Sequence, residues 1–130
     1  MTKPFLMLAG ALFVLASPAA QAEDMAGGAI KEVQTAKGEV LADAKGMTLY
    51  TFDKDQNGVS ACYDDCAKKW PPLLAAKGAK EEGELTLAKR RDGALQWAHE
   101  GMPLYLWQND KKPGDVTGDG VGGVWHVAKD

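Results

Sequence analysis

The two cysteines are the residues of this chain with the most evident chemistry. Cys62 and Cys66 are its only cysteines, and they lie four positions apart. In an oxidising compartment such a pair is first interpreted as a disulfide. On a regular helix, residues four apart have Cβ atoms about 5–6 Å apart, whereas a disulfide needs about 3.5–4.5 Å. If the two are bonded, residues 62–66 therefore form a loop or a distorted turn.

The alternative interpretation is a thiol-redox or soft-metal pair. Two thiolates joined by a histidine or a methionine suit Cu(I). The candidate metal ligands are Cys62, Cys66, His99 and His126, with Met47 and Met102 as further candidates. The disulfide interpretation needs no cofactor, whereas the metal-binding interpretation needs copper. The spacing of the cysteines leaves both open.

An acidic loop precedes the cysteines. Residues 53–58 read Asp-Lys-Asp-Gln-Asn-Gly, with Asp64 at the twelfth position, which is how a calcium-binding loop begins. A strand is expected before this loop instead of a helix, and Ser60 stands where an apolar residue is expected. The preferred interpretation is an Asp/Asn/Gly turn. Asp115 and Asp119 form a looser acidic group, which we interpret in the same way.

The histidines offer no catalytic arrangement. His99 lies beside a turn and is expected at the surface. His126 alternates with apolar neighbours and is expected to face away from them. No P-loop, Gly-x-Ser-x-Gly, His-Glu-x-x-His or dinucleotide fingerprint is present. The sequence therefore gives no positive indication of an enzyme.

The elements that position these residues come in two copies. The segment 46–55, GMTLYTFDKD, returns as 101–110, GMPLYLWQND. A gap-free alignment of 38–72 on 93–127 keeps turn glycines, core residues and two acids, while surface positions differ, as expected of a duplicated unit. The identical pairs are Gly38/Gly93, Gly46/Gly101, Met47/Met102, Leu49/Leu104, Tyr50/Tyr105, Asp55/Asp110, Asp64/Asp119 and Trp70/Trp125. Two units are too few for a solenoid, so we expect them to pack about a pseudo-twofold axis.

Each copy is predicted to be an antiparallel meander, with turns at Lys-Gly, Asp-Gly and Glu-Gly pairs. The expected strands are 30–35, 40–43 and 47–52 in the first copy, and 84–89, 94–98, 102–107 and 124–127 in the second. Residues 70–74 cannot form a regular central strand, because two prolines remove two donors. A short helix or turn is expected within 60–69, with Ser60 as its N-cap. The predicted fold is mainly β, with two pseudo-symmetric repeats of a three- to four-stranded meander.

The repeated strand has apolar residues on both faces, which predicts burial on both faces. Its aromatic residues are therefore expected in the core, and two matched acids remain as polar candidates. These repeat-motif residues are Tyr50, Phe52, Asp55, Tyr105, Trp107 and Asp110.

The first 22 residues have the pattern of a secretory signal peptide. Lys3 is followed by an apolar run from Phe5 to Ala16, which is too short for a bilayer of about 30 Å, and Ala20-Gln21-Ala22 is a small-x-small cleavage site. Residues 23–29 are expected as a flexible lead-in, and 30–130 as one domain with repeats at 30–74 and 84–128 and a linker between them. No cysteine follows the cleavage site, so no lipid anchor is expected, and no membrane span remains after cleavage. The expected location is the bacterial periplasm or the cell exterior.

The charge pattern bears on the partner. The net charge is −3, and no basic run or basic-aromatic stripe is present. This argues against nucleic acid. The sequence does not identify another partner.

The repeated motif resembles that of a known family. Tyr-x-(Phe/Trp/Tyr)-x-x-Asp stands at 50–55 and again at 105–110, and 60–73 carries a cysteine-Trp-Pro-Pro signature. Residues 101–105 and the closing 123–127 are also similar to the family pattern. The chain thus resembles the bacterial secreted-repeat family, also described as predicted lipoproteins with this motif.

The resemblance covers nearly all of 38–128 and implies a secreted protein whose biochemical role is unassigned. One departure is that no lipidation cysteine follows the leader. We therefore expect a secreted or periplasmic, non-enzymatic binding or structural module. The alternative is a periplasmic copper-binding or thiol-redox protein that uses Cys62 and Cys66.

Overall fold

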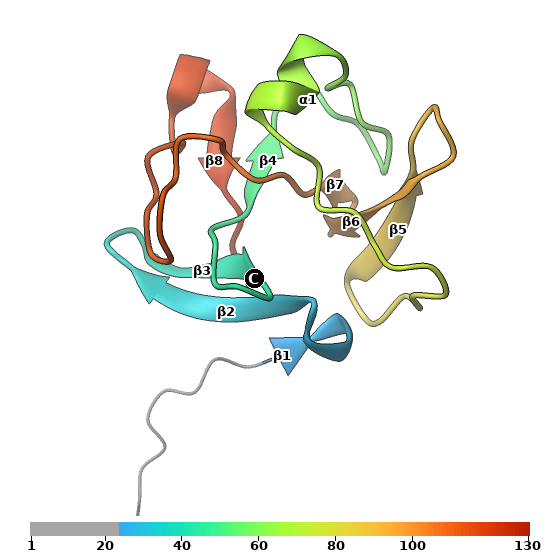
Figure 1. The fold of residues 1–130 in the computed structure, drawn as a ribbon, viewed down its shortest axis with the longest axis horizontal. Coiled ribbons are helices and arrows are strands. Elements are labelled where there is room, and N and C mark those ends of the chain that lie inside the picture. Colours follow the sequence, from blue (N-terminus) through green and yellow to red (C-terminus); the bar gives the residue numbers. More distant parts are fainter. Residues whose placement is uncertain (1–23) are drawn as a thin grey trace, which may run out of the picture.

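The structure is a computed structural model that describes residues 24–130, so the expected signal peptide, 1–22, lies outside the described residues. Short strands dominate, which confirms the mainly-β class (Figure 1). In chain order, the elements are β1 (Asp24–Met25), the 3-10 helix η1 (Ala26–Gly28), β2 (Ile30–Thr35), β3 (Gly38–Asp43), β4 (Tyr50–Phe52), α1 (Asp65–Lys69), β5 (Leu85–Lys89), β6 (Leu95–His99), β7 (Met102–Pro103), the 3-10 helix η2 (Val121–Gly123) and β8 (Trp125–Val127).

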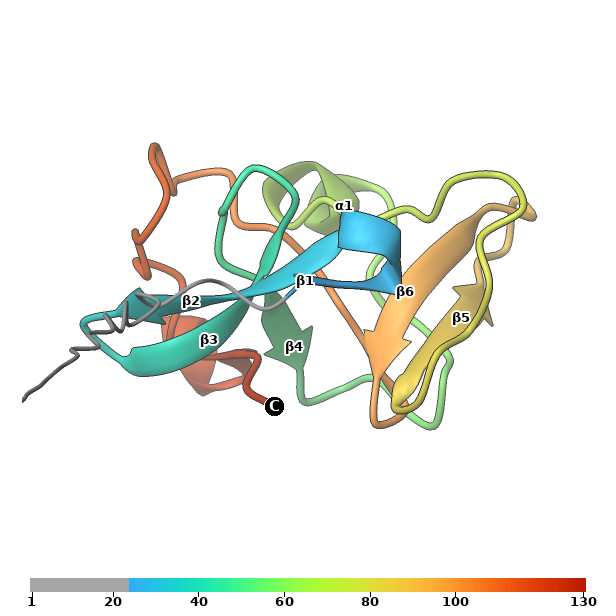
Figure 2. The same ribbon diagram turned by 90° about the horizontal axis from the view of Figure 1, so that it is seen from below.

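The strands form three small antiparallel sheets, ordered β1–β2–β3, β4–β8 and β5–β6–β7. Figure 2 shows the β2–β3 hairpin and the β5–β6 hairpin on opposite sides of β4. Residues 24–28, where the sequence predicts a flexible lead-in, form β1 and η1, and β1 pairs with the start of β2. In the described part of the chain, none of the helices combines the length and the apolar character that crossing a bilayer requires.

The two hairpins are closed by glycines in the left-handed region. Gly38 has φ +92° at the β2–β3 turn, and Gly93 has φ +90° at the β5–β6 turn. A side chain is disfavoured at both positions because L-residues rarely adopt a positive φ. Asp92 adds to the second turn by accepting a hydrogen bond from the Ala94 N–H at 2.9 Å. Both turns lie where the sequence predicts them.

The repeated strand changes partners along its length, and the regular strands are therefore shorter than predicted. Leu49 N–H still donates to Leu41 of its own repeat at 2.9 Å. One residue later, Tyr50 exchanges both main-chain hydrogen bonds with Tyr105 of the other repeat, at 2.9 and 3.0 Å. Regular pairing in β4 then covers only Tyr50–Phe52, not the whole of 47–52.

The closing segment of each repeat pairs with the other repeat. β8 pairs with β4, and Ala128 N–H donates to Leu49 C=O at 2.8 Å. At the matching positions, Leu73 N–H donates to Leu104 C=O at 2.9 Å. Residues 70–74 make only single bridges, as their prolines predict. A pseudo-twofold axis therefore passes between Tyr50 and Tyr105, where the two copies meet.

Two buried clusters lie on the two faces of the repeated strand, so its predicted burial on both faces is confirmed. One cluster contains Leu49 and Leu104, and the other contains Tyr50 and Tyr105. Each cluster takes residues from both repeats. The complete buried sets are Ile30, Leu41, Leu49, Leu85, Trp97, Leu104 and Ala128 in the first cluster, and Tyr50, Phe52, Cys62, Trp70, Tyr105 and Trp125 in the second.

The helix near the cysteines starts later than the sequence predicts. It covers Asp65–Lys69 and follows Asp64, whose φ of +56° lies in the left-handed region. Ser60 does not cap this helix, so that prediction is wrong. Its hydroxyl accepts a hydrogen bond from the Cys62 N–H at 3.2 Å. The left-handed turn at Asp64 separates this serine from the helix.

Candidate functional site

Cys62 and Cys66 form a disulfide, with a Cα–Cα distance of 5.2 Å. Cys62 is fully buried and lies before α1, while Cys66 is half-buried in its first turn. The irregular turn at 63–64 lets the two sulfurs meet, as the sequence predicts for a bonded pair. The disulfide interpretation is confirmed, and sulfurs bonded in this way are not thiolate ligands.

The two histidines each form a side-chain contact with an aspartate. His99 Nε2 is 3.2 Å from Asp130 Oδ1, and the residue is only 6% exposed, so the prediction of a surface position is wrong. It is buried because it ends β6, which pairs with β5 and β7 at that position. His126 is exposed as predicted, with Nε2 2.9 Å from Asp53 Oδ2. Within residues 24–130, no three His, Cys, Asp or Glu side chains are grouped as a metal ion would require.

The matched tyrosines and aspartates of the repeat motif bind each other across the pseudo-twofold axis. Tyr50 OH donates to Asp110 Oδ2 at 2.7 Å, and Tyr105 OH donates to Asp55 Oδ2 at 2.6 Å. Each hydrogen bond joins the tyrosine of one repeat to the aspartate of the other. All four residues are buried, and burial is the main reason that the pKa values of both tyrosines are raised. The motif therefore joins the two repeats, and its tyrosines and aspartates are buried away from any ligand in solvent.

Asp55 is the centre of a buried polar network near the disulfide. Its Oδ1 accepts a hydrogen bond from the Ala61 N–H at 2.7 Å. Burial raises the pKa of the Asp55 carboxyl, while hydrogen bonds from Tyr105 and Ala61 and the charge of Arg90 oppose this rise. Because the Tyr105 proton goes to Asp55, the Ser60 hydroxyl donates to Tyr105 across 2.6 Å.

Arg90 completes this network, and the sequence analysis missed it. Its guanidinium is buried and donates to Ser60 Oγ at 3.1 Å, to Gln96 Oε1 at 2.7 Å and to the Cys62 carbonyl at 2.8 Å. It also lies 4.3 Å from the centre of the Tyr63 ring, in the geometry of a cation–π contact. The sequence offers only a weak signal, because Arg90 aligns with Thr35 and its charge is therefore not repeated in the first copy.

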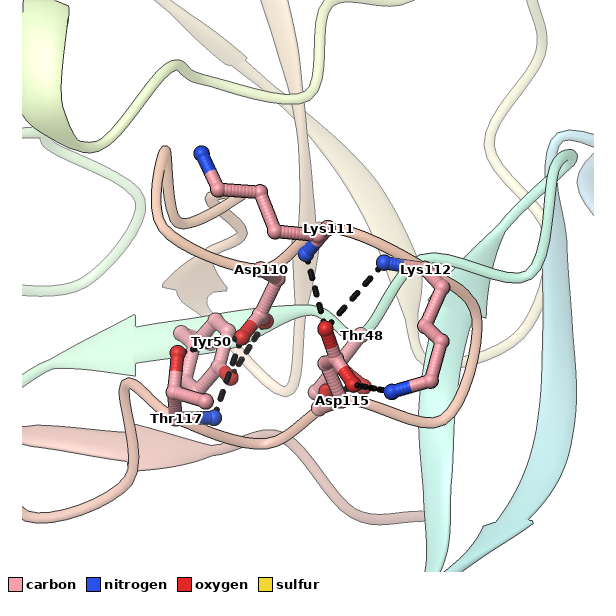
Figure 3. A network of polar contacts seen from close by, with 7 residues as sticks. All are labelled: Thr48, Tyr50, Asp110, Lys111, Lys112, Asp115 and Thr117. Carbon is pink, nitrogen blue, oxygen red and sulfur yellow. Dashed lines mark hydrogen bonds and ion pairs between the residues drawn. The ribbon is translucent and has the colours of Figure 1, made fainter.

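The second repeat has a corresponding network around Asp110, shown in Figure 3. Asp110 Oδ1 accepts hydrogen bonds from Thr117 N–H at 3.0 Å and Thr117 Oγ1 at 2.7 Å. Asp115 Oδ1 lies 2.7 Å from Lys112 Nζ, and this contact lowers the pKa of Asp115 and raises that of Lys112. Thr48 Oγ1 donates to the Asp115 carbonyl at 2.7 Å, which ties this loop to the first repeat. Asp110 and Asp115 therefore stabilise the loop after β7 by accepting hydrogen bonds from other residues of that loop.

The calcium-like loop also uses its acids internally, which supports its interpretation as a turn. Asp53 faces His126, and Asp55 points into the core. Gln56 and Val59 exchange main-chain hydrogen bonds at 3.2 and 2.6 Å, and Gly58 has φ +77°. The carboxylates of residues 53 and 55 therefore do not converge on one cation.

Four aromatic rings stack along the pseudo-twofold interface. The Trp70 and Trp125 rings are 3.8 Å apart, at an angle of 2°. Phe52 stacks on Trp125 at 4.1 Å, and the matching Trp107 stacks on Trp70 at 3.9 Å. Gly118 lies against this stack, and a Cβ there would approach the Trp70 ring to 2.8 Å. Tyr50, Phe52 and Tyr105 are thus core residues, as predicted, while Trp107 is half-buried and packs against the same cluster.

The described surface includes two hollows that are open to solvent. The larger has a volume of about 350 Å³ and is lined by Lys54, Gln56, Asn57, Val59 and Ala61, from the loop that precedes the disulfide. The smaller, of about 260 Å³, lies beside the β5–β6 turn. Val59 and Leu74, one in each hollow, are the exposed large hydrophobic residues in the described part of the chain, at 63% and 53% exposure.

Comparison with known proteins supports the duplicated unit. A family model described as a secreted repeat of unknown function matches the chain twice, over residues 31–74 and 86–129. No curated protein and no solved structure matches the chain. The two matched segments agree with the two copies found in the sequence and together cover more than half of it. The protein therefore belongs to this family of secreted repeats of unknown function.

Proposed function

We propose that this protein is a non-enzymatic binding module of the bacterial periplasm or cell exterior, and that its ligand occupies the hollow over residues 54–61. The location is supported by the signal-peptide pattern of residues 1–22 and by the disulfide, which forms and persists in oxidising compartments. The membership in a secreted family agrees with it.

The observation that carries the binding role is the hollow itself. Its volume of about 350 Å³ lies at the lower end of the usual range for small-molecule sites. Val59 stands 63% exposed at this hollow. An exposed side chain of this kind adds little to the core. A single exposed apolar residue is ordinary on a protein surface, so Val59 supports the proposal only through its position in the hollow.

The hollow is fixed before any ligand arrives. The Gln56–Val59 hydrogen bonds close its turn, and Gly58 N–H donates to the Gly101 carbonyl of the other repeat at 2.7 Å. Asp55 Oδ1 accepts a hydrogen bond from the Ala61 N–H at 2.7 Å, which fixes the end of the loop. A preorganised loop loses little conformational entropy on binding, which favours affinity.

The lining indicates the chemistry of the ligand. Lys54 offers an ammonium group, Gln56 and Asn57 offer amides that donate and accept, and Val59 and Ala61 offer methyl groups. This set suits a small molecule with a carboxylate next to a short apolar group. The corresponding stretch of the second repeat has Asn109, Lys111 and Lys112, so the lining is not a repeated feature.

Nuclear magnetic resonance can test this role. The processed chain is labelled with ¹⁵N and titrated with N-acetylalanine and, separately, with its neutral amide. We expect amide shift changes confined to 54–61, larger for the acid, and weakened in the variants Lys54→Ala and Val59→Ser. Lys111→Ala, in the matching loop, is the control that should bind as the parent does. Shift changes outside this loop, or equal responses in all variants, would exclude the hollow as the site.

A second candidate function is thiol redox at the disulfide. It is favoured by the half-buried Cys66 and by the absence of the pair from the second repeat, which has Thr117 and Val121 at these positions. A thiol reductant that supplies two electrons and two protons, and is itself oxidised to a disulfide, would convert the bond into two thiols. These thiols bind Cu(I) as thiolates once they release their protons. Intact mass with and without reductant, together with copper analysis of the purified protein, separates these states. A disulfide that resists glutathione would sink this candidate.

A further inference from the structure

We infer that each repeat is an incomplete half whose partner is another repeat, so that this chain can exchange halves with a second copy of itself. The main chain carries the first argument. β4 of the first repeat pairs with β8 of the second, and residues 71–75 of the first repeat pair with 95–106 of the second. Each repeat therefore donates its closing segment to the other and lacks one of its own.

The buried side chains carry the second argument. The Tyr50–Asp110 and Tyr105–Asp55 hydrogen bonds both cross between the repeats. The central contact of the aromatic stack, Trp70 on Trp125, also crosses between them. An isolated repeat would expose these rings and leave its tyrosine and its aspartate without the partners that they have in the other repeat, and both effects are unfavourable.

The covalent link between the halves contributes little to this interface. Residues 76–84 are exposed except for the half-buried Ala79, and they are rich in Lys, Glu and Gly. The Glu81 carboxylate accepts a hydrogen bond from the Leu87 N–H at 2.9 Å, at the edge of β5. The halves are thus held together by their own strands and side chains, and the linker mainly keeps them close.

The same contacts can form between two chains. If the first repeat of one copy pairs with the second repeat of another, every hydrogen bond and ring contact of the interface is kept, and only the path of the linker changes. The linker favours the single-chain form because it holds the halves at a high effective concentration. Refolding at high protein concentration should shift molecules towards an intertwined dimer.

The test uses the full chain with a specific protease site inserted between Lys77 and Gly78. After cleavage, the two pieces should elute together at the volume of the intact chain and keep its near-ultraviolet circular dichroism, which reports on the stacked tryptophans. Mixing cleaved ¹⁵N-labelled and unlabelled protein, unfolding in urea and refolding should give hybrid complexes in native mass spectrometry. Separation of the pieces, or loss of the near-ultraviolet signal on cleavage, would overturn the inference.

Two further variants keep the test decisive. If the inserted site disturbs folding before cleavage, the same site between Glu82 and Gly83 replaces it. The cleaved variant Tyr50→Phe/Tyr105→Phe lacks both crossing side-chain hydrogen bonds and should separate at lower urea than the cleaved parent. Equal urea midpoints for the two cleaved proteins would contradict the role given to these hydrogen bonds.

Discussion

At the scale of single residues, the repeat motif joins the two repeats through crossed tyrosine–aspartate hydrogen bonds. A tyrosine and an aspartate that are close in sequence do not bind each other, because each reaches the matching residue of the other repeat. A hydrogen bond from a neutral phenol to a carboxylate is charge-assisted and stronger than a neutral pair. Burial removes water as a competing partner, so breaking either bond leaves a buried group unsatisfied.

The buried Asp55 predicts a pH dependence of stability. Its folded pKa is raised above the usual 3.8, chiefly by burial. The protonated form is therefore favoured by folding, and this contribution is complete below pH 3.8 and is lost as pH rises through the folded pKa. The free energy of unfolding of the parent, minus that of the variant Asp55→Asn, should decrease as pH rises above about 4.

Urea unfolding of both proteins from about pH 4 to pH 7 measures this difference. The asparagine can still accept from the Ala61 N–H, so both proteins should remain folded across the range. A difference that grows with pH would show that the carboxylate is favoured in the folded state, contrary to its burial.

At the scale of elements, the sequence predicted the hairpins well because Gly38 and Gly93 fix their turns. It overestimated the repeated strand, because residues 47–52 and 102–107 change partners and alternation in sequence does not report a change of partner. It misplaced the start of α1, since the left-handed Asp64 has no distinctive sequence pattern. Arg90 was missed for a similar reason: its network depends on contacts between distant segments.

The disulfide is expected to stabilise one element more than the whole molecule. Its ring spans a sequence separation of 4, and the loop-closure model gives about 2 kcal/mol for so small a ring. The variant Cys62→Ala/Cys66→Ala should lower the free energy of unfolding by about this amount and remain folded. Chemical denaturation measures the loss, and reductant should destabilise the parent without affecting the variant. Unfolding of the variant in plain buffer would show that the disulfide holds the domain together.

The loop after β7 approaches the aromatic stack so closely that only glycine fits. A Cβ at residue 118 would lie 2.8 Å from the Trp70 ring and 3.0 Å from the Trp107 ring. The variant Gly118→Ala should lose about 1–3 kcal/mol of stability, as overpacked cores do, and change the near-ultraviolet circular dichroism. Gly120→Ala is the matched control, because nothing lies within 4 Å of its Cβ position and only its φ of +86° is strained. Equal spectra for the two variants would contradict the close approach.

At the scale of the whole molecule, the sequence predicted the number of units and their pseudo-twofold packing, since matched glycines, tyrosines and tryptophans recur at one spacing. It did not predict that the closing segments cross between units. A strand pairs equally well with either copy of a duplicated partner, so the pattern of residues cannot choose between them. The hollow over 54–61 could not be predicted from the repeat pattern either, because the loop that forms it differs between the two copies.

The exchange of tyrosines and aspartates between repeats is the central claim, and double-mutant cycles measure it most directly. Cycles built from Tyr50→Phe and Asp110→Ala, and from Tyr105→Phe and Asp55→Ala, should give coupling energies of about 0.5–3 kcal/mol, as residues in contact do. The cycle within one motif, from Tyr50→Phe and Asp55→Ala, should be additive within about 0.5 kcal/mol. Coupling within the motif and additivity between the repeats would contradict this account.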